Sequence, residues 1–137
     1  MGAESGRADA RPRHLFALWL LVGLGLCGVF IYGCLMPSPP SEPQIPYFDK
    51  LEHAFAFTVM AAWFGTLFAG RNGLVLLALS AFGVLTEVMQ WASGYRDGDP
   101  LDWMADTFGI LIGLVLVRAG AMRWLVYLDR RVATARN

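Results

Sequence analysis

The stretch Leu15–Met36 reads LFALWLLVGLGLCGVFIYGCLM, an apolar run of 22 residues with no charged side chain. As an α-helix it would be about 33 Å long, which matches the roughly 30 Å hydrocarbon thickness of a bilayer. A cleavable signal peptide has a shorter apolar region and a small-residue cleavage site, whereas this run ends at Pro37. We therefore predict a retained membrane-spanning helix.

The composition agrees with a membrane location. The chain has 137 residues and is 56% hydrophobic, too apolar for the surface of one soluble domain. Its 11 basic and 11 acidic residues cancel, so net charge gives no reason to expect nucleic acid as a partner. Three more apolar runs carry ionisable residues near one end. The sequence predicts an all-α membrane protein, a bundle of four transmembrane helices with spans at about 15–36, 51–69, 74–91 and 101–117.

The basic residues predict the orientation of these spans. Nine of the 11 precede the first span, lie in the 70–73 turn or follow the fourth span, and only Lys50 and Arg96 lie on the other side. Cytoplasmic loops are enriched in Lys and Arg, so both termini should be cytoplasmic, with a segment at 1–14 and a basic tail at 118–137. The opposite, outer side is locally acidic.

The tail and the cysteines have simple interpretations. Within 121–132, apolar residues recur at helical spacing and aromatic residues and arginines accompany them, which predicts an interfacial helix. Cys27 and Cys34 lie seven residues apart in one span, so about 10 Å of helix axis prevents a disulfide between them. We interpret both as small packing residues.

Polar residues from three predicted spans fall at one depth in the membrane. Counted at about 1.5 Å per residue from the cytoplasmic ends, this layer lies roughly 18 to 26 Å up a core of about 30 Å. Charged groups at such depth are costly, so they should face one another or water. The sequence thus predicts a shared polar pocket in the outer leaflet. Its members are His53, Glu87, Gln90, Asp102 and Asp106.

Spacing places these residues on common helix faces. Glu87 and Gln90 are three apart, Asp102 and Asp106 are four apart, and His53 follows Asp49 by four and Lys50 by three. Gly109 and Gly113 continue the face of the last span as a GxxxG pattern, which predicts close helix packing.

Helix capping is the competing explanation for some of the acids. Asp99-Pro100 followed by Asp102 is typical of a helix start, and Asp49 with Glu52 resembles a capping box. Capping does not explain Glu87, late in its helix, or Asp106, two turns into the next. These two acids carry more functional weight. A structural ion pair of Glu87 with Arg96 or Lys50 is the alternative.

Taken in order, these motifs resemble the signature of VanZ-like membrane proteins. The pattern DKxxH corresponds to 49–53, ExxQ to 87–90, a following arginine to Arg96, and DxxA(N/D)xxG to 102–109. The resemblance implies a small multi-pass protein of the bacterial cytoplasmic (inner) membrane, from a family named after a member linked to teicoplanin resistance. Asp106 stands where the family pattern usually has asparagine.

Three functions fit these residues. The first is binding of a lipid-linked envelope precursor, a membrane lipid or an amphiphilic antibiotic, with phosphate contacts from basic residues and hydrogen bonds from acids and an amide. These ligand-binding candidates are Lys50, His53, Glu87, Gln90, Arg96, Asp102 and Asp106.

The second function is a membrane-embedded enzyme with acid/base groups. A metal-dependent variant would use the same side chains as N and O ligands, but we predict no cofactor and no resident metal. The candidate catalytic residues are His53, Glu87, Asp102 and Asp106. A small proton-coupled transporter is the third function, with Asp106 as the coupling carboxylate.

Overall fold

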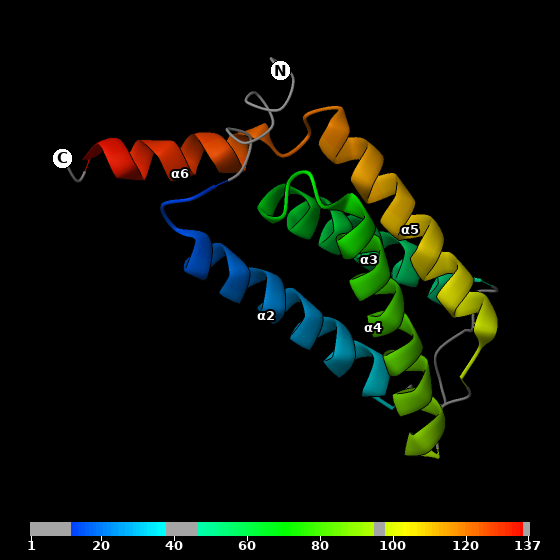
Figure 1. Cartoon of the computed structure of the whole chain (residues 1–137). Helices are drawn as coiled ribbons and strands as arrows, with labels where there is room; N and C mark the ends of the chain where they lie inside the picture. Colours follow the sequence, from blue (N-terminus) through cyan, green and yellow to red (C-terminus); the bar gives the residue numbers. More distant parts are fainter. Residues whose placement is uncertain (1–11, 38–46, 95–97, 136–137) are drawn as a thin grey trace.

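A computed structural model describes residues 12–37, 47–94 and 98–135, and all regular structure in these ranges is helical. Four long helices alternate in direction, and a fifth lies across one end of them (Figure 1). Their bounds are α2 Phe16–Leu35, α3 Phe48–Leu67, α4 Asn72–Ser93, α5 Pro100–Arg118 and α6 Arg123–Ala135. The predicted all-α class and the position of every predicted helix are confirmed to within a few residues.

Three of the helices, α2, α4 and α5, are long and apolar enough to cross a membrane by length and composition. The helix α3 is not among them, although the sequence predicts a span there. Its first turns carry Asp49, Lys50, Glu52 and His53. Much of its remaining surface is buried between its neighbours, so a lower mean hydropathy does not require contact with water.

The local sequence correctly predicts how α5 begins but not how α3 begins. The Asp99 carboxylate accepts a hydrogen bond from the Leu101 amide at 2.9 Å, and Pro100 opens α5, as predicted. The predicted capping box at Asp49 and Glu52 is wrong. Helix α3 begins at Phe48, after Tyr47 in the left-handed region (φ 64°), and no side chain caps it. Asp49 lies inside the first turn of α3, and its carboxylate pairs with Lys50 at 3.2 Å.

The predicted close packing at the GxxxG pattern is present between α3 and α5. A Cβ atom at Gly109 would collide with the carbonyl oxygen of Ala54, and one at Gly113 with that of Thr58. The Thr58 hydroxyl also donates to the Gly109 carbonyl oxygen at 3.1 Å. Because the two backbones lie this close, α5 holds its polar residues directly against α3.

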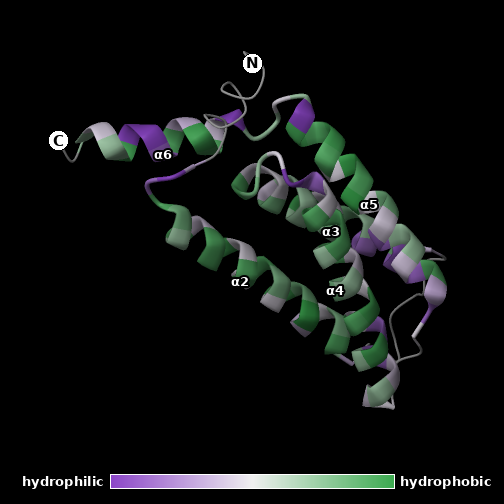
Figure 2. Cartoon of the chain, viewed as in Figure 1, coloured by the Kyte–Doolittle hydropathy of each residue, from purple (hydrophilic) through white to green (hydrophobic). Residues whose placement is uncertain are grey.

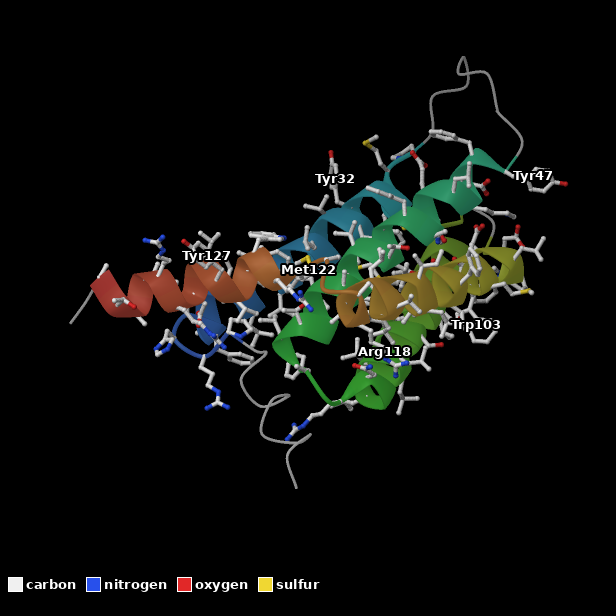
Figure 3. The ribbon with its side chains drawn as sticks, turned by 90° about the horizontal axis from the view of Figure 1, so that it is seen from above. Tyr32, Tyr47, Trp103, Arg118, Met122 and Tyr127 are labelled. Atoms are coloured by element: carbon white, nitrogen blue, oxygen red, sulfur yellow. The ribbon has the colours of Figure 1, made fainter. Side chains whose placement is uncertain are left out.

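The outside of the helices is apolar where they would meet lipid, and the ends are polar (Figure 2). Leu21, Val29 and Leu77 are each more than 60% exposed, which a water-soluble surface would not favour. Tyr32 and Tyr47 project outward at the end where α2 finishes and α3 begins, and Tyr127 projects from α6 (Figure 3). Exposed aromatic residues at two levels are typical of the two interfaces of a membrane.

Helix α6 is attached to the start of α2 through Asp129, which is 1% exposed. The carboxylate of Asp129 accepts hydrogen bonds from the backbone amides of Arg13, His14 and Leu15 at 2.8, 3.0 and 2.8 Å. The Trp19 indole donates to it at 3.1 Å. Asp129 therefore supplies, from more than 100 residues away in the chain, the acceptor that the amides at the start of α2 need.

Candidate functional site

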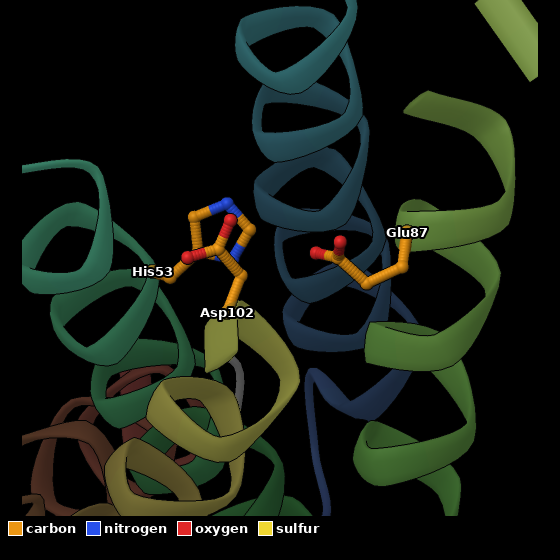
Figure 4. A group of neighbouring side chains, drawn as sticks. All are labelled: His53, Glu87 and Asp102. Atoms are coloured by element: carbon orange, nitrogen blue, oxygen red, sulfur yellow. The ribbon is translucent and has the colours of Figure 1, made fainter. Parts of the chain in front are cut away.

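The predicted polar residues converge where the end of α2, the start of α3, the end of α4 and the start of α5 meet. His53, Glu87 and Asp102 come from three different helices and point into one space (Figure 4). Ligand atoms of these three residues all lie within 4.8 Å of one another. Predicted depth and predicted helix faces thus identified side chains that lie close together in the folded chain.

Lys50 is surrounded by carboxylates. Its Nζ lies 2.7 Å from an oxygen of Asp99, 2.9 Å from Asp102 and 3.2 Å from Asp49. The Lys50 ammonium, followed by the Leu101 amide, holds the pKa of Asp99 below its ordinary value. The positive charge of Lys50 is therefore already balanced, and a phosphate would have to compete with these acids for it.

His53 has a buried carboxylate partner, but not the one that its spacing suggests. The sequence places Asp49 one turn before His53, whereas His53 Nδ1 lies 2.9 Å from Oδ1 of Asp106 on α5. His53 is 6% exposed and Asp106 is fully buried. Gly83 of α4 makes room for this carboxylate, since a Cβ atom there would lie 2.6 Å from Asp106 Oδ2. One proton therefore lies between two side chains that are shielded from solvent.

Glu87 and Gln90 reach the site from α4. Glu87 Oε2 accepts a hydrogen bond from the Asp99 amide at 2.8 Å, and Gln90 Nε2 donates to the Cys34 carbonyl oxygen at 3.4 Å. Glu87 Oε1, Gln90 Oε1 and Asp106 Oδ2 are buried and have no hydrogen-bond partner within the described ranges. Buried polar atoms are normally satisfied, so these three acceptor oxygens mark positions where a hydrogen-bond donor, a water molecule or an ion could bind.

A cavity of about 810 Å³ opens onto this cluster. Its apolar walls come from α2 and α3 and include Val29, Phe30 and Val59. Its polar end is lined by Asp49, Glu52, His53, Gln90, Asp99 and Asp102. A volume in the range of small-molecule sites, with apolar walls and a few convergent polar groups, is typical of a ligand pocket.

Two features of the site lie beyond the sequence-based predictions. Cys34, which the sequence indicated as a packing residue, is buried and lines this cavity. Its Sγ lies 4.0 Å from His53 Nε2. Asp99, predicted only as a cap, also binds Lys50. Neither contact has a local signal, because the partners lie 19 and 49 residues apart in the chain. Arg96, a predicted phosphate ligand, lies outside the described residues.

Comparisons of the chain with family models, with curated proteins and with solved structures find no match.

Proposed function

We propose that this chain is a VanZ-like protein of the bacterial inner membrane that binds an amphiphile in the cavity between α2 and α3. The observation that carries the proposal is a single cavity with apolar walls and a polar end. The residues of the VanZ-like motifs that the structure describes meet at that end or pack the helices beside it. The acyl or polyprenyl chains of a ligand would lie against the walls and its headgroup against the polar end.

The proposed topology has four spans with both termini in the cytoplasm. It is supported by the alternating directions of α2 to α5 and by the end of the bundle at which α6 lies (Figure 1). The basic residues Arg118 and Arg123 lie at that end, and cytoplasmic ends of membrane proteins carry such residues. In this arrangement α3 crosses the membrane with its polar first turns at the outer surface. The cavity then opens in the outer leaflet.

The charges of the site refine the class of headgroup. Acceptor oxygens dominate the polar end of the cavity, and Lys50 is held by three carboxylates. A headgroup rich in donors, such as sugar hydroxyls or the amines and amides of a peptide, would satisfy Gln90 Oε1 and the acids. Lipid-linked envelope precursors and amphiphilic glycopeptides both carry such donors, so both are proposed ligands.

The test is ligand binding by the full chain purified in mild detergent. We expect a polyprenyl phosphate sugar to raise the melting temperature and to be retained in native mass spectra. Val59→Trp should fill the apolar groove and Gln90→Leu should remove polar contacts, so each should weaken retention by at least about tenfold. Leu77→Trp is the matched control, because Leu77 is 69% exposed and does not line the cavity.

The binding proposal fails if folded wild-type protein retains no lipid beyond bulk phospholipid. It also fails if the Val59 and Gln90 variants bind as wild type does.

A second candidate function is acyl transfer. It is favoured by the chain of contacts from Cys34 to His53 and from His53 to Asp106. His53 Nε2 faces the Cys34 thiol at 4.0 Å, and Nδ1 is held by Asp106 at 2.9 Å, the order that an activated thiol requires. Nε2 would accept the thiol proton while sulfur attacks the carbonyl carbon of an acyl ester. The acyl C–O bond would then break, and the proton would pass from Nε2 to the leaving alcohol oxygen, which leaves a thioester on Cys34. Cys34 lies at the carboxyl end of α2, where the helix dipole disfavours a thiolate, so this function ranks second.

Mass spectrometry of the chain after incubation with an acyl-lipid mixture tests the acyl-transfer function. An adduct on Cys34 that is lost in His53→Gln would support the enzyme. Cys27→Ser is the control, because Cys27 contacts the Met60 sulfur and lies away from His53. No adduct in wild type would exclude this function.

A further inference from the structure

We infer that a divalent transition-metal ion binds beside the polar end of the cavity, held by His53, Glu87 and Asp102. Their ligand atoms are at most 4.8 Å apart (Figure 4). Ligands at about 2.0 to 2.2 Å from one ion are separated by roughly 3 to 3.6 Å in tetrahedral or octahedral geometry. Small side-chain rotations therefore close the three ligands around an ion, with no movement of the helices.

Unsatisfied oxygens give a second and independent reason. Glu87 Oε1 and Gln90 Oε1 are buried without a hydrogen-bond partner among the described residues, and Gln90 is only 4% exposed. Gln90 lines the same cavity as His53 and Asp102. Both orphaned atoms are acceptors, so among the described residues neither has a donor or a positive charge beside it. A metal ion supplies what a carboxylate and an amide oxygen lack.

The second partner of His53 fits a metal ligand. Its Nδ1 lies 2.9 Å from the Asp106 carboxylate, so Nε2, which faces the Cys34 Sγ at 4.0 Å, is the nitrogen that would bind an ion. Histidine ligands usually donate their other N–H to a carboxylate, which fixes the ring and raises its basicity. We assign Asp106 as a positioning residue: it is fully buried, in contact with His53, and absent from the group of ligand atoms.

Charge also favours a cation at this place. Glu87 and Asp102 are proposed ligands, and Asp99 and Asp106 contact members of the cluster. Lys50 is the one lysine or arginine that the described part of the chain pairs with these four acids. Lys50 contacts Oδ1 of Asp102, so the proposed ion would be held by Oδ2. Imidazole with carboxylates selects Zn²⁺ or Mn²⁺ over Ca²⁺, which prefers an all-oxygen shell.

The metal site does not depend on the proposed amphiphile binding. If both hold, the ion would also provide the positive charge that a phosphate headgroup needs, since Lys50 is already engaged by acids. No ligand spacing within one segment of the sequence indicates a resident metal, because the three ligands come from three helices. Their proximity exists only in the folded bundle.

The experiment is Zn²⁺ titration of the chelator-stripped full chain in detergent, followed by calorimetry and elemental analysis without added lipid. We expect saturable binding of a single equivalent. Glu87→Gln and Asp102→Asn should each weaken it by more than about tenfold, and Asp106→Asn by about 10- to 100-fold. Asp49→Asn is the matched control, because it removes an equal charge beside Lys50 without removing a proposed ligand.

A spectroscopic readout separates coordination from loss of fold. Co²⁺ bound by His53 should give a visible absorption band that His53→Gln removes, while circular dichroism shows that the variant is still helical. The inference is overturned if folded wild type binds no Zn²⁺ saturably, or if Glu87→Gln and Asp102→Asn bind as tightly as Asp49→Asn. Zn²⁺ binding without lipid retention would support the metal and reject the amphiphile, and the reverse result would do the opposite.

Discussion

Replacing Asp129 by asparagine should loosen helix α6 from the start of α2. Each carboxylate oxygen of Asp129 accepts two hydrogen bonds, Oδ2 from the amides of Arg13 and His14, Oδ1 from the Leu15 amide and the Trp19 indole. Asparagine keeps one acceptor oxygen and turns an NH₂ group toward the other two donors. Two charge-assisted hydrogen bonds are lost, at about 1.5 kcal/mol each, so we expect roughly 3 kcal/mol of destabilisation.

Denaturant unfolding of the full chain in detergent, followed by tryptophan fluorescence, measures this free energy. Limited proteolysis with trypsin measures the release of α6, because Arg123, Arg130 and Arg131 lie in that helix. Thr134→Ala is the control on the same helix, since the Thr134 hydroxyl is exposed and donates to the Arg130 carbonyl oxygen, and an exposed change costs less than about 0.5 kcal/mol. An Asp129→Asn variant as stable and as trypsin-resistant as Thr134→Ala would refute the reasoning.

Three further predictions test the same structure. The dependence of stability on pH should also come from Asp129. Burial opposes ionisation of this carboxyl group. Hydrogen bonds from the His14, Leu15 and Arg13 amides and from the Trp19 indole outweigh burial and lower the pKa of Asp129 below the ordinary 3.8. The carboxylate therefore stabilises the fold above about pH 4, and this contribution is lost as the pH falls through the lowered pKa; Asp129→Asn should flatten the decline in unfolding free energy measured below pH 4. Gly109→Ala should destabilise the chain by about 1 to 3 kcal/mol, because the new Cβ atom would collide with the Ala54 carbonyl oxygen. Gly25→Ala is the control, because nothing lies near a Cβ atom there. Equal unfolding free energies of the two variants would contradict the α3–α5 contact. Expression of wild type in a Gram-positive host should protect against teicoplanin, and His53→Ala and Glu87→Ala at matched membrane levels should abolish the protection; full protection by both variants would make the cluster structural.

Local patterns in the sequence were enough to identify the helices. The apolar run Leu15–Met36 corresponds to α2, the Asp99-Pro100 cap starts α5, and the spacing of Gly109 and Gly113 marks the contact with α3. Each of these depends on residues within a few positions of one another, and helical hydrogen bonds join residues four apart.

The members of the polar cluster could also be predicted, but not their pairing. Depth along each span brings His53, Glu87, Gln90, Asp102 and Asp106 to one level, because helix rise per residue is constant. Depth says nothing about rotation between helices. For this reason depth did not predict that His53 pairs with Asp106 on another helix, and not with Asp49 one turn away on its own.

What the sequence by itself determined is the helical class, the apolar character of α2, α4 and α5, and the list of polar residues that share a level. Only the tertiary structure decided which of these residues touch. It places Cys34 beside His53, Lys50 between Asp99 and Asp102, and Asp129 at the start of α2. The physical reason is that side chains touch only within about 4 Å. The rotation of two packed helices against each other decides which side chains come that close, and no local pattern in one helix contains that rotation.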